Sequence, residues 1–270
     1  MTLVSAAVLG LVQGLTEFLP VSSSAHLILA RAFFGWDDQA LGLPFDVACH
    51  VGTLLAVLVF FWRDIVAMIQ ALPRAFSATP GPDGRRIWLV AAGTIPVVIV
   101  GGLVWSNALE EKTRTPLVAA TMLLAGAVLL FIVERLGTRG KGEEALTIPG
   151  AVAIGVAQTT ALVPGVSRSG ATIAAGMTLG LRREVAARFT FLMSIPAILA
   201  AAAKEGLELR HQPFGPNDRA LFAVGMATSA IVGYFTVKYF IKFLTSHRLD
   251  VFAWYRVALA VVTFVWLATR

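Results

Sequence analysis

The chain alternates between long apolar runs and short stretches that are polar or charged. A membrane-spanning helix needs about 20 mainly apolar residues. Six runs approach that length, and each is predicted to cross a membrane once. The first and fourth are short, so we expect them to extend past their charged flanks. The predicted spans cover roughly residues 47–62, 87–109, 116–134, 189–203, 220–243 and 251–269.

Two further apolar stretches are interrupted near their middle. Residues 3–34 are broken by Glu17, Pro20 and a run of three serines, and residues 147–181 are broken by a Pro-Gly pair and Arg168. Irregular backbone at membrane depth is tolerated only where it is buried in protein or lines a wet cavity. We therefore predict two re-entrant hairpins, each made of two short helices joined by a polar turn.

Composition narrows the class of protein. Hydrophobic residues make up 57% of the chain and charged residues 14%, against about 45–50% and roughly 25% in soluble domains. These values exclude a disordered chain, a coiled coil and an ordinary soluble enzyme. The single cysteine, Cys49, excludes an intramolecular disulfide and a zinc site made of thiols. The sequence predicts one all-α polytopic membrane domain that covers residues 1–270.

The distribution of charge predicts how the chain is oriented. The formal net charge is +6, and the basic excess lies in loops at residues 73–86, 135–146 and 182–188, which the predicted spans place on one side. Basic loops of membrane proteins face the cytoplasm, so the excess indicates topology rather than nucleic-acid binding. Both termini are then expected to face outward. The first hairpin enters the membrane from outside and the second from inside.

The two hairpins also resemble each other in sequence. Three predicted spans follow each hairpin, and because this number is odd, the two halves, roughly residues 1–134 and 147–270, are expected to have inverted topologies. Interrupted hydrophobic segments at matching places in two halves indicate a binding site near the membrane midplane. Chance is the alternative, because Gly, Ser and Val are common in membrane helices. One constant offset matches Gly10 with Gly155, Gln13 with Gln158, Val21 with Val166, Ser22 with Ser167, Ser24 with Ser169 and Gly35 with Gly180.

The first hairpin carries residue types that suit a metal ion. Gln13 and Glu17 are four residues apart, so a helix places both on one face. Their oxygens can hold a hard cation such as Mg²⁺ or Ca²⁺ with help from substrate phosphates. The alternative is that Glu17 is only a buried hydrogen-bonding group and that Ser22–Ser24 only cap a helix. A carboxylate within a membrane segment is costly, which favours a functional role.

The second hairpin carries residue types that suit an anion. Ser167 and Ser169 precede an apolar helix, whose free N–H groups at its start can bind phosphate. Arg168 adds a permanent planar charge that can contact a phosphate with two hydrogen bonds. The alternative is an arginine that snorkels to water, but Arg168 lies mid-stretch between short apolar arms.

In the first hairpin, His26 near the serines suits attack on phosphorus with an acid or base.

The segments QGLTEFLPVSSSAH and PGVSRSGATI resemble the two signature motifs of the bacterial undecaprenyl-pyrophosphate phosphatases of the BacA/UppP type, and the resemblance extends over essentially the whole chain. It implies an enzyme that removes the terminal phosphate of undecaprenyl pyrophosphate in the bacterial plasma membrane. The product is the lipid carrier for peptidoglycan synthesis, and the activity confers resistance to bacitracin. The resemblance also implies dependence on Mg²⁺ or Ca²⁺ and a homodimer.

The same resemblance implies roles for individual residues. Glu17 and Gln13 correspond to the acidic pair that binds metal, although many members carry glutamate where this chain has Gln13. Ser23 corresponds to the nucleophile and His26 to the essential histidine, which we expect to act as the base or as the acid for the leaving group. Whether serine or a metal-activated water attacks is open. The residues expected to bind the pyrophosphate are Arg168, with supporting contacts from Ser22, Ser24, Ser167, Ser169 and Thr172.

Two other classes of function compete with the phosphatase. A lipid-phosphate flippase or another secondary transporter would share inverted repeats and broken helices. It would need no serine and histidine beside Glu17, and it would release no phosphate. A structural or channel protein is disfavoured by the polar content of both hairpins. His50, in contrast to His26, is expected to pack or to lie at the interface rather than to take part in catalysis.

Overall fold

The computed structural model describes residues 1–36, 42–105, 107–137, 140–209 and 215–270, which are almost entirely helical. Among these residues, six helical segments are long and apolar enough to cross a membrane, which confirms the predicted all-α polytopic class. The first and fourth extend past their charged flanks as expected. The segments are Gly42–Phe60, Gly81–Val104, Pro116–Leu136, Arg183–Lys204, Pro216–Leu244 and Asp250–Ala268.

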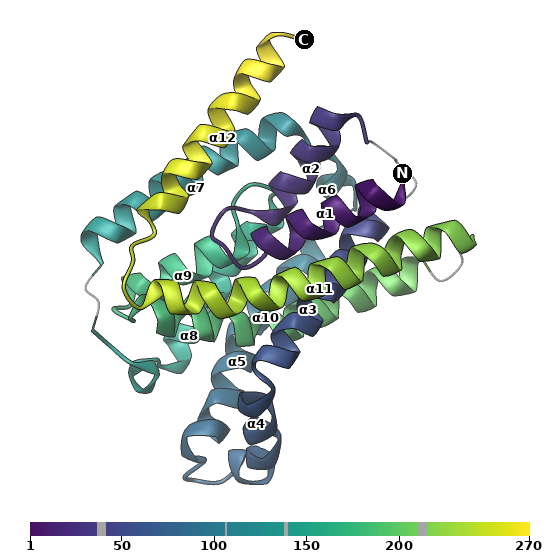
Figure 1. The fold of residues 1–270 in the computed structure, drawn as a ribbon. Helices are drawn as coiled ribbons and strands as arrows, with labels where there is room; N and C mark the ends of the chain where they lie inside the picture. The colour runs from purple at the N-terminus through teal and green to yellow at the C-terminus, as the bar shows by residue number, and fades with distance from the viewer. Residues whose placement is uncertain (37–41, 106, 138–139, 210–214) are drawn as a thin grey trace.

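The helices are numbered along the chain in Figure 1. Short π-helical or 3-10 turns are named η. The elements are α1 (Leu3–Thr16), α2 (Ser23–Phe34), α3 (Gly42–Phe60), α4 (Trp62–Ala75), α5 (Gly81–Ile99), η1 (Val100–Val104), α6 (Asn107–Thr113), α7 (Pro116–Leu136), η2 (Glu143–Ala145), α8 (Ile148–Thr159), η3 (Thr160–Leu162), α9 (Arg168–Thr178), α10 (Arg183–Leu209), α11 (Pro216–Leu244) and α12 (Asp250–Ala268).

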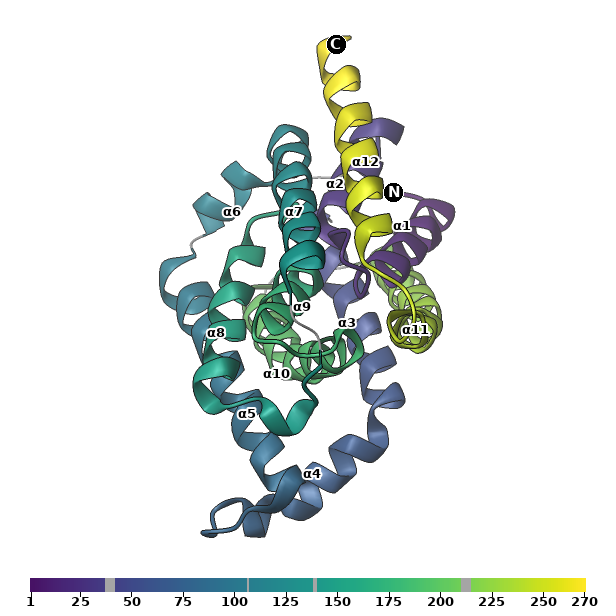
Figure 2. The same ribbon diagram turned by 90° about the vertical axis from the view of Figure 1, so that its left-hand side faces the viewer.

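The two hairpins lie among the spanning helices. α1 packs along α11, α2 contacts α7, and α8 packs along α5, while α9 contacts α7 and α10. α12 lies beside α7, and α11 beside α3, as both views of the ribbon show (Figures 1 and 2). Small residues permit these close approaches: a Cβ at Gly52 would overlap Ser229 of α11, and one at Gly155 would overlap the backbone of Gly93.

Both hairpins turn in the same unusual way. Ser22 and Ser167 have φ angles of 70° and 75°, a left-handed conformation that few residues other than glycine adopt. Each serine precedes a helix, α2 or α9, and its hydroxyl accepts a backbone N–H of the first turn. Gly35 and Gly180, which also match in sequence, have φ angles of 64° and 89° after those helices. The local geometry thus repeats, while the inverted relation of the two complete halves stays a prediction.

Ion pairs connect the charged segments at each end of the bundle. Arg86 donates to Glu143 with N···O distances of 2.6 and 3.0 Å, so the segments 73–86 and 135–146 lie on the same side. At the opposite end, Arg114 contacts Asp46, which joins the start of α3 to the segment before α7. Each ion pair therefore joins segments that the order of the predicted spans places on the same side of the membrane.

The hydrophobic pattern missed α4, and it also missed α6, because the span predicted over residues 87–109 ends at Val104 and a separate helix follows. The sequence suggested a loop over residues 73–86, but α4 extends through Ala75, and α5 begins at Gly81. Arg63 and Asp64 interrupt the apolar run, which obscured the helix. α4 is amphipathic and exposes large apolar side chains along one face, namely Trp62, Val66, Ile69 and Leu72.

Arg256 of α12 holds the two hairpin turns together. Its side chain is fully buried, and its guanidinium donates hydrogen bonds of 2.8 to 3.2 Å to backbone carbonyl oxygens. A carbonyl left without a partner in the apolar interior would be costly. The acceptors come from the first turn (Pro20), from the second turn (Gly165 and Val166) and from α7 (Met122 and Leu123).

We expect Arg256→Met to destabilise the fold by about 3 kcal/mol or more, because each buried carbonyl left unpaired costs about 1–3 kcal/mol. Thermal unfolding of the purified protein in detergent measures the effect. The matched control is Arg135→Met, which removes an exposed arginine near the end of α7. Equal melting temperatures for the two variants would show that Arg256 does not hold the turns.

Candidate active site

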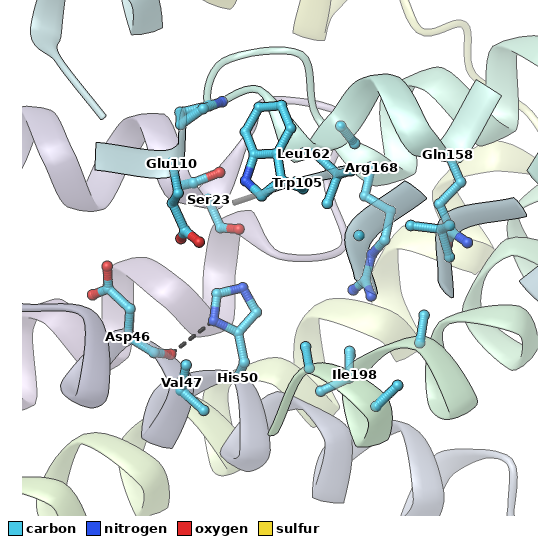
Figure 3. A pocket seen from close by; sticks show the side chains of 18 of the residues that line it. Ser23, Asp46, Val47, His50, Trp105, Glu110, Gln158, Leu162, Arg168 and Ile198 are labelled. Carbon is cyan, nitrogen blue, oxygen red and sulfur yellow. Dashed lines mark hydrogen bonds between the residues drawn. The ribbon is translucent and has the colours of Figure 1, made fainter. Parts of the chain in front are cut away.

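The two hairpin turns meet at a cavity of about 570 Å³. Its polar side chains include those of Glu17, Ser23, His50 and Arg168, which come from both hairpins and from α3 (Figure 3). Much of the remaining wall is apolar and belongs to α5, η1, η3 and α10. The apolar lining includes Val97, Val98, Leu162, Ala197, Ile198 and Ala201.

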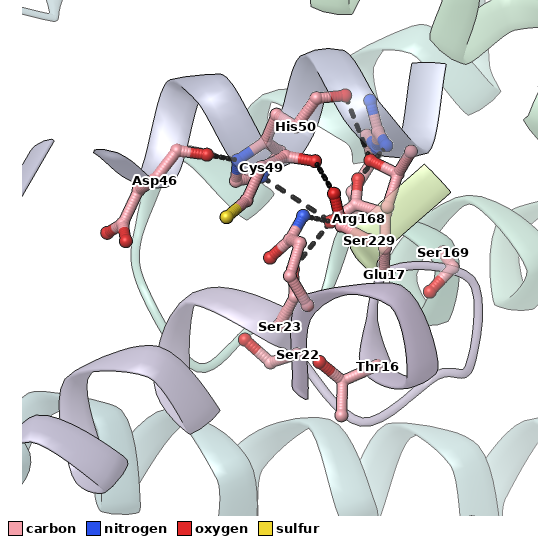
Figure 4. A network of polar contacts seen from close by, with 12 residues as sticks. Thr16, Glu17, Ser22, Ser23, Asp46, Cys49, His50, Arg168, Ser169 and Ser229 are labelled. Carbon is pink, nitrogen blue, oxygen red and sulfur yellow. Dashed lines mark hydrogen bonds and ion pairs between the residues drawn. The ribbon is translucent and has the colours of Figure 1, made fainter. Parts of the chain in front are cut away.

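Glu17 is the centre of a network of polar contacts (Figure 4). Its side chain is buried, and its Oε2 accepts hydrogen bonds from Ser23 Oγ at 2.6 Å and from Gln13 Nε2 at 2.8 Å. Arg168 contacts the other oxygen, Oε1, and His50 Nε2 lies 3.4 Å from Oε2. One carboxylate therefore joins the proposed nucleophile of the first hairpin to the guanidinium of the second.

The backbone of the first hairpin explains this geometry. α1 ends at Thr16, but Glu17 still has helical φ and ψ angles of −63° and −40°. Gln13 and Glu17 therefore lie on one face, as expected. α2 begins at Ser23, directly after the left-handed Ser22.

The two turns also bind each other directly. Ser22 Oγ accepts a hydrogen bond from the backbone N–H of Gly165 at 3.1 Å. Ser169 Oγ donates to the carbonyl of Leu19 at 2.9 Å. These bonds cross between the hairpins, so each turn sets the position of the other.

Only part of the expected phosphate-binding set lines the cavity. Ser22, Ser24, Ser167 and Arg168 are among the lining residues. Ser169 and Thr172 are not, and their hydroxyls make hydrogen bonds within the protein. Ser169 bonds to Leu19, and Thr172 Oγ1 donates to the carbonyl of Arg168 at 2.7 Å, within α9.

His26 is not placed where the expectation put it. Its Nδ1 lies 2.7 Å from the carbonyl oxygen of Ser22, and its Nε2 lies 2.7 Å from the hydroxyl of Tyr255, on which the ring also stacks. One ring nitrogen is thus engaged within the first hairpin and the other by α12, and His26 is not among the cavity-lining residues. The structure does not bring His26 to Ser23, where we expected it to act as the base or as the acid for the leaving group.

His50 takes the position beside the carboxylate instead. Its Nδ1 is 2.7 Å from the carbonyl oxygen of Asp46, one turn earlier in α3, which leaves Nε2 facing Glu17. Asp46 is buried between Arg31, at 2.6 Å, and Arg114. The spacing of Asp46 and His50 is the same four residues as that of Gln13 and Glu17, a signal that sequence reasoning did not use.

The donor set fits a metal ion that shares its coordination with a phosphate. Gln13 Oε1 is buried beside Glu17 and has no hydrogen-bond partner among the described residues. An oxygen of this kind is available to a hard cation. Within the described part of the chain, no three His, Cys, Asp or Glu side chains gather to hold a metal by themselves. Most ligands would therefore be water or substrate oxygens.

This geometry suits chemistry on phosphate. A serine hydroxyl that donates to a carboxylate is the arrangement of an activated nucleophile. A guanidinium and the starts of α2 and α9 face the same cavity and can bind a phosphate. The fold and site thus define a multi-pass membrane protein with a membrane-embedded site for a phosphorylated ligand.

Residues 6–262 match the family described as Bacitracin resistance protein BacA, and the chain belongs to this family. A protein of Rubrobacter xylanophilus named undecaprenyl-diphosphatase is 47% identical over 96% of both chains. Proteins of the same name from Trichlorobacter lovleyi and Alcanivorax borkumensis are each 44% identical; the alignments cover 96% and 97% of this chain and 94% and 98% of theirs.

The contact between the turns gives a matched pair of test variants. Ser22→Gly and Ser167→Gly both remove a helix cap and both relieve a positive φ angle. Only Ser22→Gly also leaves the buried N–H of Gly165 without its partner. We expect Ser22→Gly to be less stable than Ser167→Gly by about 1–3 kcal/mol in thermal unfolding. Equal stabilities would mean that the bond between the turns contributes nothing.

Proposed function

We propose that this chain is a phosphatase that converts undecaprenyl pyrophosphate to undecaprenyl phosphate and inorganic phosphate. The observation that carries the proposal is the contact of Ser23 and Arg168 with the two oxygens of Glu17 in a cavity with an apolar wall. The relatives named undecaprenyl-diphosphatase support hydrolysis rather than the lipid-phosphate flippase. The product would return to peptidoglycan synthesis, which accounts for bacitracin resistance.

The substrate has a doubly phosphorylated head and a long isoprenyl chain, and the cavity has matching parts. Arg168 and the starts of α2 and α9 bind the pyrophosphate at the polar end. The isoprenyl chain leaves between the apolar residues of α5 and α10, such as Val97 and Ile198. Open space lies beside Gly102 of η1 in this wall, since a Cβ built there would meet nothing within 4 Å.

Ser23 is the proposed nucleophile. Its Oγ attacks the terminal phosphorus, its proton passes to Glu17 Oε2 along the 2.6 Å hydrogen bond, and the bond to the bridging oxygen breaks. The proton then moves to the departing lipid phosphate. In the second step water attacks the phosphoserine, Glu17 takes the proton from that water, and Ser23 regains it as inorganic phosphate leaves. Direct attack by water is the alternative, and trapping of phosphoserine distinguishes the two routes.

The other site residues support this sequence. Arg168 stabilises the negative charge that develops on the phosphate oxygens. Mg²⁺ or Ca²⁺, held by Glu17 and Gln13 Oε1, would neutralise further charge there. His50 is the imidazole nearest to the carboxylate, so we assign His26 to holding the start of α2 rather than to the chemical step.

The chain is a multi-pass membrane protein. We propose that it resides in the bacterial plasma membrane as a homodimer, with both termini and the mouth of the cavity facing outward. The basic loops support this orientation. An outward site would meet the pyrophosphate where wall assembly releases it.

The phosphatase proposal is tested with the purified full-length chain and an isoprenyl pyrophosphate. We expect phosphate release that stops with a chelator and returns with Mg²⁺ or Ca²⁺. Ser23→Ala and Arg168→Ala should each lower kcat/KM by at least about a hundredfold, because they remove the nucleophile and the phosphate contact. Ser246→Ala, an exposed serine at the end of α11, is the control. Binding without phosphate release by the wild type would contradict the proposal and favour a flippase.

The orientation is tested by cysteine labelling in whole cells. Asp37→Cys, in the segment between α2 and α3, is introduced on a Cys49→Ser background, which removes the chain's single, buried cysteine. A membrane-impermeant thiol reagent should label position 37 in intact cells. Labelling only after the cells are opened would place this side in the cytoplasm and reverse the proposed orientation.

A further inference from the structure

Gln158, near the end of α8, is a buried amide without a partner. Its side chain is 1% exposed, and neither Oε1 nor Nε2 makes a hydrogen bond among the described residues. A buried polar group without a partner is costly and rare in native proteins. Because Gln158 also lines the cavity, a ligand in that cavity can supply the missing partner.

Gln158 lies where the polar end of the cavity gives way to the apolar wall. α8 and α5 run side by side: Gly155 contacts the backbone of Gly93, and a Cβ at Gly101 would lie 3.7 Å from Leu162 Cδ2. Gln158 falls between these two contacts. In Figure 3 it lies on the Arg168 side of the cavity, well away from Asp46 and Glu110.

This position corresponds to one particular part of the proposed substrate. The phosphate that is transferred faces Ser23 and Glu17, and the isoprenyl chain lies along the apolar wall. The phosphate that stays on the lipid must lie between them. An amide N–H is a suitable donor to a phosphate oxygen, and the amide oxygen can accept from water or from a protonated phosphate.

We propose that Gln158 binds the phosphate that the isoprenyl lipid retains, so that the cavity contains a subsite for an isoprenyl monophosphate. The proposal rests on the proposed function and adds to it the direction in which the substrate lies. Arg168 and Ser23 act on the transferred phosphate, while Gln158 contacts the product that leaves with the lipid. Gln158 is therefore a substrate-binding residue that takes no part in proton transfer.

Product inhibition separates the two phosphates. The assay follows hydrolysis of farnesyl pyrophosphate by the full-length protein in detergent. The inhibition constants of farnesyl monophosphate and of inorganic phosphate are measured for the wild type and for Gln158→Met. We expect the constant for farnesyl monophosphate to rise by about tenfold or more in the variant, since a hydrogen bond to a charged group is lost. The constant for inorganic phosphate should stay within about twofold.

Thermal unfolding provides the second measurement. Because the amide has no partner in the described part of the chain, Gln158→Met should melt at the same temperature as the wild type or higher. The matched control is Thr190→Val, which removes a buried hydroxyl that also has no partner among the described residues, at a position that does not line the cavity. Both inhibition constants should be unchanged in that control.

Several outcomes would overturn the inference. They are an unchanged constant for farnesyl monophosphate, an equal rise in both constants, or a lower melting temperature with unchanged inhibition. If Gln158→Met fails to fold, Gln158→Asn, whose shorter amide cannot make the same contact, carries the same expectation. If the wild type releases no phosphate, the proposed function fails, and the thermal shift caused by farnesyl monophosphate in wild type and variant still decides whether the subsite exists.

Discussion

The fold depends on satisfying the backbone of two turns that interrupt helices within an apolar layer. The apolar layer offers no hydrogen-bond partners, so the protein must supply them wherever the turns do not face the cavity. Arg256 of α12 does so for the carbonyls of Pro20, Gly165 and Val166. Because the same guanidinium also donates to two carbonyls of α7, both turns are fixed to the α7–α12 pair. Through this arginine the hairpins become a rigid part of the bundle rather than loops.

Fixing the turns also fixes the chemistry. The left-handed conformation of Ser22 and Ser167 is unfavourable by itself, and it persists because each hydroxyl caps a helix and the turns are bonded across to each other. Each turn then delivers the next residue, Ser23 or Arg168, to the Glu17 carboxylate. The strained backbone of each turn therefore helps to place one of two side chains, Ser23 or Arg168, at the Glu17 carboxylate.

The sequence predicted those parts of the molecule that depend on spacing along the chain. The spans follow from apolar length, and the shared face of Gln13 and Glu17 follows from helical periodicity. The position of His26 depends on its contact with Tyr255, which is distant in the chain and which spacing does not reveal. The four-residue spacing of Asp46 and His50 was present in the sequence but was not used. α4 was missed for a different reason, since a short amphipathic helix leaves no long apolar run.

The two hairpin turns share a local geometry but carry different side chains at equivalent positions. The offset that matches Ser22 with Ser167 matches Ser23 with Arg168, and each of these is the first residue of its helix, α2 or α9. It also matches Glu17 with Leu162, which lies in the apolar lining. At equivalent positions, the first hairpin therefore carries the hydroxyl of Ser23 and the carboxylate of Glu17. The second hairpin carries the guanidinium of Arg168 and the apolar side chain of Leu162. Glu17, Ser23 and Arg168 together form the polar end of the cavity that is suited to the phosphates, while Leu162 adds to the apolar wall that is suited to the lipid chain.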